Sequence, residues 1–454
     1  VDFIRSLYEN GMDVVRLNSA HASIEGAQKV VDNVREVSDK IAILIDTKGP
    51  EIRLTAMEST VGFVLKKGER IDFIDSTSGL CGHNGLYTNC QSFVKDVPVG
   101  AHILIDDGSA DLIVTEKHND RLICEAQNTA VIKGRKSINV PGVDIELPSL
   151  TDKDRMFINW AIDADIEFVA HSFVRSRKDL AEINAIIESR GSHLKIISKI
   201  ENQQGIDNLE EILNDCYGVM IARGDLGVEI AAEKIPHIQE KMIQKCRARK
   251  KPVIVATQML HSMIDNPRPT RAEVTDVSNA IAQRADAIML SGETASGKYP
   301  IEAVKMMASI AEQAEKDKIS EYDIKLPLNE NSSVTEFLAK NAIKATEQLG
   351  VKGIITDVNT GKTARILSSY RGPNPVIALC YKEKLVRQLS LSYGITPVYQ
   401  HDKKELHEQY VAALQMLLQE GFVTMDDKIA HLGGSFGEKK GTTFLEINNV
   451  KDLV

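Results

Sequence analysis

With 454 residues, the chain is too long for a single ordinary hydrophobic core, so two or three domains are expected. Its 43% hydrophobic and 26% charged residues are typical of a soluble globular protein, and no apolar run is long enough to cross a membrane. The net charge of -9 and the lack of basic runs argue against a nucleic-acid partner, so any anionic ligand must be held by a few converging cations. The six scattered cysteines are interpreted as reduced thiols of a cytoplasmic protein.

In chain order, a helix is expected first, over Phe3–Glu9. Short apolar runs then alternate with helix-period segments in two stretches, from Asp13 to Asp46 and from Leu150 to Glu315. The runs predict parallel strands covered by helices, and repeated βα units predict either a doubly wound sheet or a (β/α)8 barrel. The predicted strands are Asp13–Leu17, Ile41–Ile45, Glu167–Ala170, Lys195–Ser198, Gly218–Ile221, Pro252–Ala256 and Ala287–Leu290. Thr151 and Asp154 form the pattern of a capping box, and Ile230–Lys250 has helical periodicity.

Between these stretches, from Glu51 to Pro148, the pattern changes to short alternating segments punctuated by Gly, Asn and Asp. This pattern predicts a small all-β domain inserted after a barrel strand, where it would act as a lid. After Lys318, a polar linker is expected from Leu326 to Ser333, followed by a separate α/β domain. The predicted boundaries are 1–48 and 149–324 for the barrel, 49–148 for the lid and 330–454 for the C-terminal domain.

Charged and polar residues stand at the ends of six of the predicted strands. Lys199 and Glu201 alternate along one strand, so both project from the same face, where they could hold a phosphate and a divalent cation. Asp225, in a glycine-flanked turn before a helix, could join Glu201 as an oxygen ligand of Mg²⁺. Arg16 and Arg53 could form a fork for phosphate or carboxylate.

Each of these features alone also fits an ordinary surface ion pair, loop charge or helix cap. Their shared position is more informative, because the carboxyl ends of barrel strands converge on one mouth. Residues of this kind at several strand ends therefore indicate an active site.

The chain closely resembles the pyruvate kinase family over essentially its whole length. The resemblance is carried by six motifs: DTKGPEIR (Asp46–Arg53), SKIEN (Ser198–Asn202), ARGDLGVE (Ala222–Glu229), ATQML (Ala256–Leu260), PTRAE (Pro269–Glu273) and LSGETA (Leu290–Ala295). It implies a (β/α)8 TIM barrel with an inserted β lid and a C-terminal α/β domain. It also implies phosphoryl transfer from phosphoenolpyruvate to ADP, a Mg²⁺ or Mn²⁺ cofactor, K⁺ and a homotetramer.

The resemblance further implies roles for individual residues. Lys199 would stabilise the phosphoryl group during transfer. Thr257, acting through a water, would protonate the enolate, because Lys199 is held as a cation. Substrate would be bound by Arg16, Gly224, Asp225 and Thr257, and nucleotide by Arg53, Lys136 and His21. Glu201 and Asp225 would hold Mg²⁺, whereas Asn18, Asp46 and Thr47 would hold K⁺. At position 51 the chain has Glu, the residue type found in family members that require K⁺. A sugar-phosphate effector would contact Thr356, Thr360, Gly361, Lys362 and Thr363, although these residues equally fit a plain helix cap.

Three positions depart from the family pattern. Ala20 replaces a usual Ser, with Ser19 just before it, which bears on K⁺ affinity. His261 replaces a frequent Glu and is expected in a peripheral helix. The family's first barrel strand has no counterpart in this sequence, so either preceding residues supply it or the barrel is open and inactive. Two alternatives remain: a related Mg²⁺-enolate aldolase or lyase, and a non-catalytic ligand-sensing paralogue.

Overall fold

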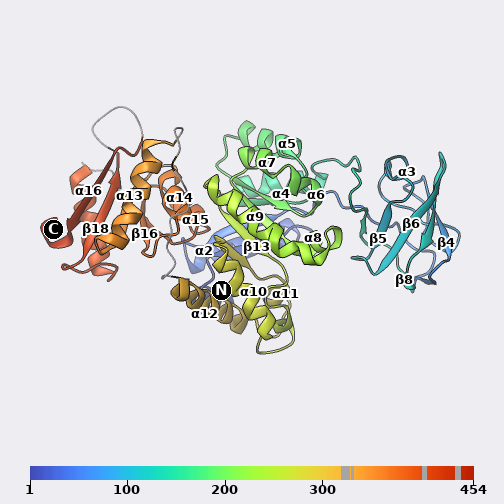
Figure 1. Cartoon of the computed structure of the whole chain (residues 1–454), viewed down its shortest axis with the longest axis horizontal. Helices are drawn as coiled ribbons and strands as arrows, with labels where there is room; N and C mark the ends of the chain where they lie inside the picture. The colour runs from blue at the N-terminus through green and yellow to red at the C-terminus, as the bar shows by residue number, and fades with distance from the viewer. Residues whose placement is uncertain (319–327, 329–331, 401–405, 435–440) are drawn as a thin grey trace.

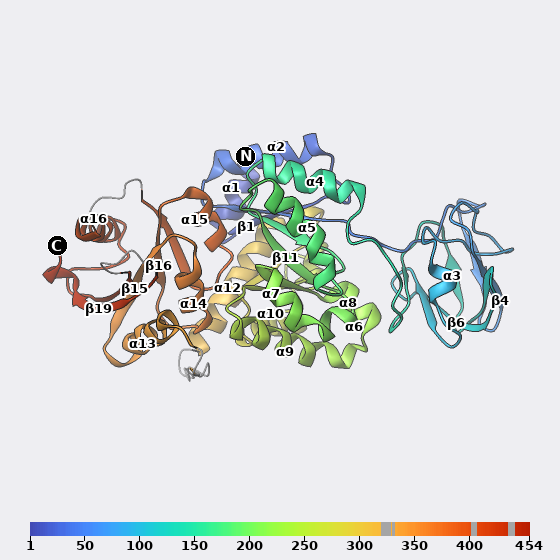
Figure 2. The same ribbon diagram turned by 90° about the horizontal axis from the view of Figure 1, so that it is seen from above.

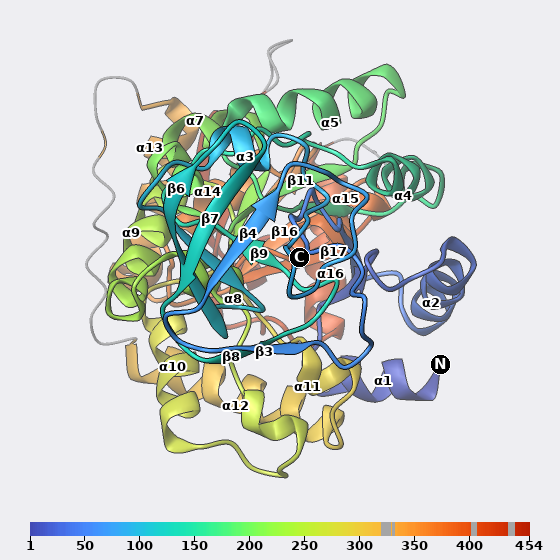
Figure 3. The ribbon, with the colours of Figure 1, turned by 90° about the vertical axis from the view of Figure 1, so that its right-hand side faces the viewer.

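The computed structural model describes residues 1–318, 328, 332–400, 406–434 and 441–454. The chain forms a central barrel unit, with a small β unit at one end and a C-terminal unit at the other (Figures 1 and 2). Seen from the end that carries the β unit, this unit lies in front of the barrel (Figure 3). No helix in the described part of the chain combines the length and apolar character needed to cross a bilayer.

The barrel unit contains a seven-stranded sheet in the order β1-β2-β10-β11-β12-β13-β14, with every pairing parallel. Its strands are β1 Val14–Asn18, β2 Ala42–Asp46, β10 Phe168–His171, β11 Lys195–Ile200, β12 Gly218–Ala222, β13 Val253–Ala256 and β14 Ala287–Met289. All seven strands expected from the sequence are confirmed, with ends that agree to within two residues. The wholly buried β2 and β12 explain the continuous apolar runs, because helices cover one face and barrel side chains the other.

Helices surround this sheet, and several of them begin at a side-chain N-cap. They are α1 Asp2–Glu9, α2 Ile24–Val37, α4 Asp152–Asp163, α5 Arg177–Ser189, α6 Gln203–Asp207, α7 Leu209–Asp215, α8 Arg223–Glu229, α9 Ile235–Ala248, α10 Arg271–Ala282, α11 Gly292–Ala295 and α12 Pro300–Lys318. The capping box expected at Thr151 and Asp154 is present. The helix expected over Ile230–Lys250 is shorter, because a 3-10 turn, Ala232–Lys234, precedes α9. The first turn of α9 contains Pro236, and the missing N–H of this proline costs little there because the first N–H groups of a helix have no partner within the helix. His261 is exposed in a second 3-10 turn, His261–Ile264.

The small β unit lies between β2 and α4 in the sequence, so it emerges at the carboxyl edge of the barrel sheet. Its elements are β3 Phe63–Leu65, β4 Arg70–Ile74, α3 Phe93–Asp96, β5 His102–Ile105, β6 Ala110–Lys117, β7 Arg121–Ala126, β8 Ala130–Ile132 and β9 Ile138–Asn139. Antiparallel strands form the sheet β4-β7-β6-β5-β9 and the pair β3-β8. The unit has its own hydrophobic core, which includes Phe73, Leu86 and Phe93.

The C-terminal unit is an α/β sandwich around the sheet β17-β16-β15-β18-β19, in which only the last pairing is antiparallel. Its elements are α13 Val334–Gln348, β15 Val351–Val358, α14 Lys362–Ser369, β16 Val376–Cys380, α15 Glu383–Leu389, β17 Ile395–Tyr399, α16 Leu406–Gln419, β18 Lys428–Gly433, β19 Phe444–Asn449 and a 3-10 turn, Val450–Asp452. The linker expected from Leu326 to Ser333 lies mostly outside the described residues, and the domain boundaries given above stay predictions.

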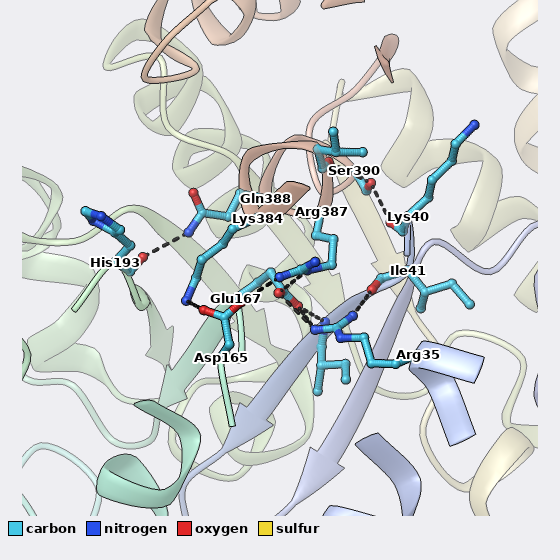
Figure 4. A network of polar contacts seen from close by, with 12 residues as sticks. Arg35, Lys40, Ile41, Asp165, Glu167, His193, Lys384, Arg387, Gln388 and Ser390 are labelled. Carbon is cyan, nitrogen blue, oxygen red and sulfur yellow. Dashed lines mark hydrogen bonds and ion pairs between the residues drawn. The ribbon is translucent and has the colours of Figure 1, made fainter. Parts of the chain in front are cut away.

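A buried carboxylate joins the C-terminal unit to the barrel (Figure 4). Glu167, fully buried just before β10, accepts two hydrogen bonds of 3.0 Å from Arg35 and one of 2.8 Å from the Ile43 amide. Arg387 of α15 reaches the same carboxylate with its Nε and also pairs with Asp165 at 2.8 Å. The C-terminal unit is therefore anchored at the amino ends of the barrel strands, opposite the β unit.

Candidate active site

Lys199 lies at the centre of a buried charge cluster at the carboxyl ends of three neighbouring strands. Its Nζ is 2.9 Å from Glu201 Oε1, 3.2 Å from Asp46 Oδ1 and 2.9 Å from the Ser172 hydroxyl. The side chain of Lys199 is 12% exposed, whereas those of Asp46 and Glu201 are 2% and 1% exposed. The structure thus brings together Lys199 of β11 and Glu201, which directly follows this strand, as the sequence predicted.

Arg16 adds a second cation from the adjacent strand. It lies two residues before the end of β1, and its Nε donates to Asp46 Oδ2 at 2.8 Å. The parallel register pairs Asn18 of β1 with Asp46 of β2. Two cations therefore converge on Asp46 at the mouth, where an oxyanion could replace part of these contacts.

The charges of this cluster are strongly coupled. Burial raises the pKa of Glu201 to about 7 although Lys199 opposes this effect, and burial also raises the pKa of Asp225. Burial acts on Asp46 in the same direction, but Lys199 and Arg16 outweigh it and lower the pKa of Asp46. For Lys199, the penalty of burial is outweighed by Asp46 and Glu201, which hold its pKa above the ordinary value. Lys199 therefore remains a cation at neutral pH and is not available as a base.

Glu201 and Asp225 have the chemistry of a magnesium site. Glu201 Oε2 accepts from the Phe173 amide at 2.7 Å, whereas the buried Oε1 has its ion pair with Lys199 but no partner with hydrogen-bond geometry. Asp225 lies in the first turn of α8, close enough that its charge raises the pKa of Glu201. No group of three or more His, Cys, Asp or Glu side chains in the described ranges could hold a metal. Two carboxylates suffice for Mg²⁺, which takes its remaining ligands from water and substrate oxygens.

Thr257 is held in a strained backbone conformation next to Gly224. Its φ of 71° is unusual for a β-branched residue, and such strain is concentrated at functional sites. Its hydroxyl accepts from the Gly224 amide at 2.8 Å and donates to the Ala256 carbonyl at 2.6 Å. The amide of Gly224, a residue expected to bind substrate, is therefore bonded within the protein, and a ligand would have to replace the Thr257 contact.

Oxygen atoms expected to bind K⁺ lie around Asp46. Asn18 Oδ1 accepts from the Ala20 amide at 3.0 Å, and the Thr47 carbonyl accepts from the Ser172 hydroxyl at 2.7 Å. The Ser19 hydroxyl is buried and has no hydrogen-bond partner within the described ranges. The Ser19 hydroxyl, which was not among the oxygens expected to bind K⁺, is therefore available next to Ala20.

The residues expected to bind nucleotide fall on two separate elements. Arg53 and Lys136 lie next to each other in the β unit, because Arg53 forms a β-bridge with Ser137. Arg53 pairs with Glu51 at 2.7 Å, and Lys136 pairs with Asp106 at 2.9 Å. His21 is exposed after β1, and no hydrogen bond or ion pair in the described structure joins its ring to Arg53 or Lys136.

The residues expected to bind an effector surround the start of α14. Gly361, with φ 77°, precedes the helix, and the Thr363 hydroxyl lies 2.8 Å from that of Thr442. Thr360 and Lys362 are exposed. Thr356 is fully buried and its hydroxyl donates to the Leu432 carbonyl at 2.9 Å, so this member of the set is already used within the sheet.

Sequence reasoning missed three contributors to the site. Ser172 touches Lys199, Asp46 and Thr47, and the Phe173 amide fixes Glu201. Arg223 donates to the Thr257 carbonyl at 2.7 Å and thereby supports its strained backbone. Ser172 directly follows β10, so the rule applied to the other strand ends could have found it.

The fold and the cluster define an α/β-barrel enzyme with cations and carboxylates gathered at the carboxyl mouth of its strands. A model of the pyruvate kinase barrel domain matches residues 1–304, and a model of the pyruvate kinase alpha/beta domain matches residues 336–447. The chain belongs to the pyruvate kinase family.

Similar proteins agree with this assignment. A pyruvate kinase of Borreliella burgdorferi is 48% identical over 458 residues, covering 100% of this chain and 95% of the relative. A pyruvate kinase of Geobacillus stearothermophilus is 39% identical, covering 100% of this chain and 78% of the relative. The crystal structure of a pyruvate kinase from Cryptosporidium parvum aligns with a TM-score of 0.93 at 34% identity, covering 98% of this chain and 92% of that one.

Proposed function

We propose that this protein transfers the phosphoryl group of phosphoenolpyruvate to ADP, giving pyruvate and ATP in glycolysis. The observation that carries the proposal is the buried cation of Lys199, held between Glu201 and Asp46 at the barrel mouth. Phosphoryl transfer needs mainly positioning and neutralisation of oxygen charge, which such a cluster supplies.

In the proposed reaction, the bond between phosphorus and the enol oxygen breaks, and a terminal phosphate oxygen of ADP forms a new bond to phosphorus. Lys199 and Arg16 stabilise the charge on the transferring oxygens, and their contacts to Asp46 orient both cations beforehand. The enolate left behind takes a proton at its terminal carbon to become pyruvate. Thr257 is the proposed route for this proton through a water, because Lys199 keeps its charge.

Two cations complete the proposed site. Glu201 and Asp225 would hold Mg²⁺ or Mn²⁺, which when bound neutralises phosphate charge and polarises the substrate oxygens. Asn18, Asp46 and Thr47 would hold K⁺, and the free Ser19 hydroxyl offers a further oxygen near Ala20. K⁺ dependence of the activity is part of the proposal.

Further proposals concern other ligands and the assembly. Arg53, Lys136 and His21 would contact the ADP phosphates when the β unit closes over the mouth as a lid. Thr360, Gly361, Lys362 and Thr363 would bind a sugar phosphate. The protein would act as a cytoplasmic homotetramer, and its six cysteines, all buried and free, suit a reducing compartment.

The test is formation of pyruvate from phosphoenolpyruvate that depends on ADP and Mg²⁺, measured with KCl and with an inert bulky cation in its place. Loss of turnover in Lys199→Met, together with wild-type turnover in the exposed control Lys29→Met, would support the assignment. Pyruvate formation that needs no ADP would instead indicate a hydrolase that passes the phosphoryl group to water. Thr257→Ala is expected to impair enolate protonation, and unimpaired protonation would remove Thr257 from the mechanism.

A further inference from the structure

A cavity lies between the barrel and the C-terminal unit, at the end of the barrel opposite Lys199. Lys250, Lys251 and Pro252, which precede β13, form its barrel side, and the last turns of α14 form its other side. The lining side chains leave a cavity of about 10 Å³, room for about one water molecule, which is partly open to solvent, so a larger ligand would have to displace lining side chains. Figure 2 shows α14 against the barrel, with the β unit at the far end of the molecule.

The lining of this cavity is strongly cationic in a chain whose net charge is -9. One carboxylate, that of Asp286, faces five cationic side chains: Arg247, Lys250, Lys251, Arg365 and Arg371. Such a concentration of one sign of charge in a partly closed space focuses the electrostatic potential and attracts anions.

The acidic groups nearby do not neutralise this lining. Asp286 pairs with Arg371 at 2.8 Å and accepts from the amides of Val253 at 3.0 Å and Tyr393 at 3.1 Å. Lys250 pairs with Glu336. Three of the five cations therefore have no acidic partner in the described part of the chain.

Those three cations contact only neutral groups. Arg247 donates to the Ser369 carbonyl at 3.2 Å, and Lys251 donates to the Cys216 carbonyl at 2.6 Å. Arg365 lies over the Tyr217 ring, 4.8 Å from its centroid, and donates to its hydroxyl at 3.4 Å. Burial and the neighbouring Arg371 lower the pKa of Arg247 to about 9, in keeping with the absence of a compensating anion.

Two buried donors of the lining are unused. Among the residues that the structure describes, nothing accepts a hydrogen bond from the Nε atoms of Arg247 and Arg371, and Arg371 is only 4% exposed as a residue. A buried donor left unsatisfied is costly, so folded proteins usually supply a partner, which can be a ligand. Other nitrogens of these groups are bonded within the protein: Arg247 Nη2 donates to the Ser369 carbonyl, and Arg371 donates to the Ser368 carbonyl and pairs with Asp286.

We infer that this cavity binds a tetrahedral oxyanion, either inorganic phosphate or the phosphoryl group of a small metabolite. Guanidinium groups suit phosphate because they offer several donors in a fixed plane, and the lysines add charge. The alternative is that Arg247 and Arg371 only cap the carbonyl end of α14. Capping explains their bonds to Ser368 and Ser369, but neither the free Nε atoms nor the presence of Lys251.

A ligand here would bridge the barrel and the C-terminal unit and would oppose their separation. The cavity also touches the amino end of β13, whose other end leads directly into Thr257. The inference goes beyond the proposed function, and its binding test does not depend on catalysis.

The test is calorimetric titration of the full chain with inorganic phosphate at constant ionic strength, with chloride as the reference anion. Saturable binding is expected, and it should weaken at least about tenfold, or about 1.4 kcal/mol, in Lys251→Met and in Arg365→Met. The matched control is Arg249→Met, because Arg249 pairs with Glu210 outside the cavity; here the affinity should stay within about twofold. Competition by glycerol phosphate distinguishes the sources, since tighter binding of the ester points to a metabolite and equal binding to inorganic phosphate.

Absence of saturable binding would overturn the inference, as would equal affinity in Lys251→Met, Arg365→Met and the control. Binding lost in Lys199→Met or Lys362→Met but kept in the cavity variants would also overturn it, because the phosphate would then occupy the mouth or the α14 loop. Should a cavity variant fail to fold, acetylation of Lys251 in the wild-type chain is the second measurement. Phosphate must slow this modification but not that of exposed Lys29, and equal rates would count against the site.

Discussion

Replacing Lys199 by methionine removes the cation that lies between the buried carboxylates of Glu201 and Asp46. Removing one preorganised charge from a phosphoryl-transfer site is expected to lower turnover by about a thousandfold. Breaking a buried ion pair by removing one partner costs about 3–5 kcal/mol of stability while both carboxylates stay ionised. Asp46 keeps Arg16 as a partner, so the cost falls mainly on Glu201.

The stability cost should depend on pH, because the pKa of Glu201 is raised in the folded state. The folded protein therefore keeps the Glu201 carboxyl protonated up to a higher pH than the unfolded chain does. Stability from this group is therefore present at low pH and is lost as pH rises from the ordinary value near 4.5 through about 7. In the wild type, this loss between pH 6 and 8 amounts to about 1 kcal/mol. Without Lys199, which lowers the pKa of Glu201, the carboxyl stays protonated to higher pH, so the loss of stability between pH 6 and 8 becomes larger.

The assay is urea unfolding of the wild type and Lys199→Met at pH 6 and pH 8. The destabilisation by the substitution should be smaller at pH 6 than at pH 8, by about 1 kcal/mol. The double variant Lys199→Met with Glu201→Gln serves as the control and should lack this extra pH dependence. An unchanged pH dependence in the single variant would refute the view that Lys199 holds Glu201 in its ionised form.

Other substitutions test the remaining parts of the structure. Glu201→Gln is expected to raise the Mn²⁺ concentration needed for half-maximal activity at least about tenfold, measured by metal titration, since one ligand charge is lost. At limiting Mg²⁺, turnover of the wild type should fall as pH drops below about 7, because protons then compete with the metal for Glu201; a flat profile from pH 8 to 6 under these conditions would contradict this role. Glu167→Gln should lower the free energy of unfolding by about 3–5 kcal/mol, because Arg35 and Arg387 lose their shared buried carboxylate. Asp165→Asn, at a carboxylate that is 63% exposed, should cost less than about 1 kcal/mol, and similar losses in both variants would contradict the importance of burial.

The sequence by itself was sufficient for the elements and for the main members of the site. Continuous apolar runs such as the one in β2 predicted parallel strands because burial on both faces leaves no place for polar residues. Lys199 and Glu201 were predicted to share a face because strand side chains alternate. The position of α9 was predicted less well, since the helical period begins before Pro236 and only the backbone shows where the chain becomes helical.

Only the tertiary structure decided which groups are already bonded to one another. Residues far apart in the sequence meet in space, such as Ser172 with Lys199 and Asp46, or Gly224 with Thr257, and no local pattern encodes such contacts. The raised pKa of Glu201 likewise follows from burial and from distant charges. The sequence did not predict the cationic cavity that Arg247 and Arg365 line. Its charged side chains come from the barrel and from the C-terminal unit, and no local pattern in the sequence indicates that these two units meet there.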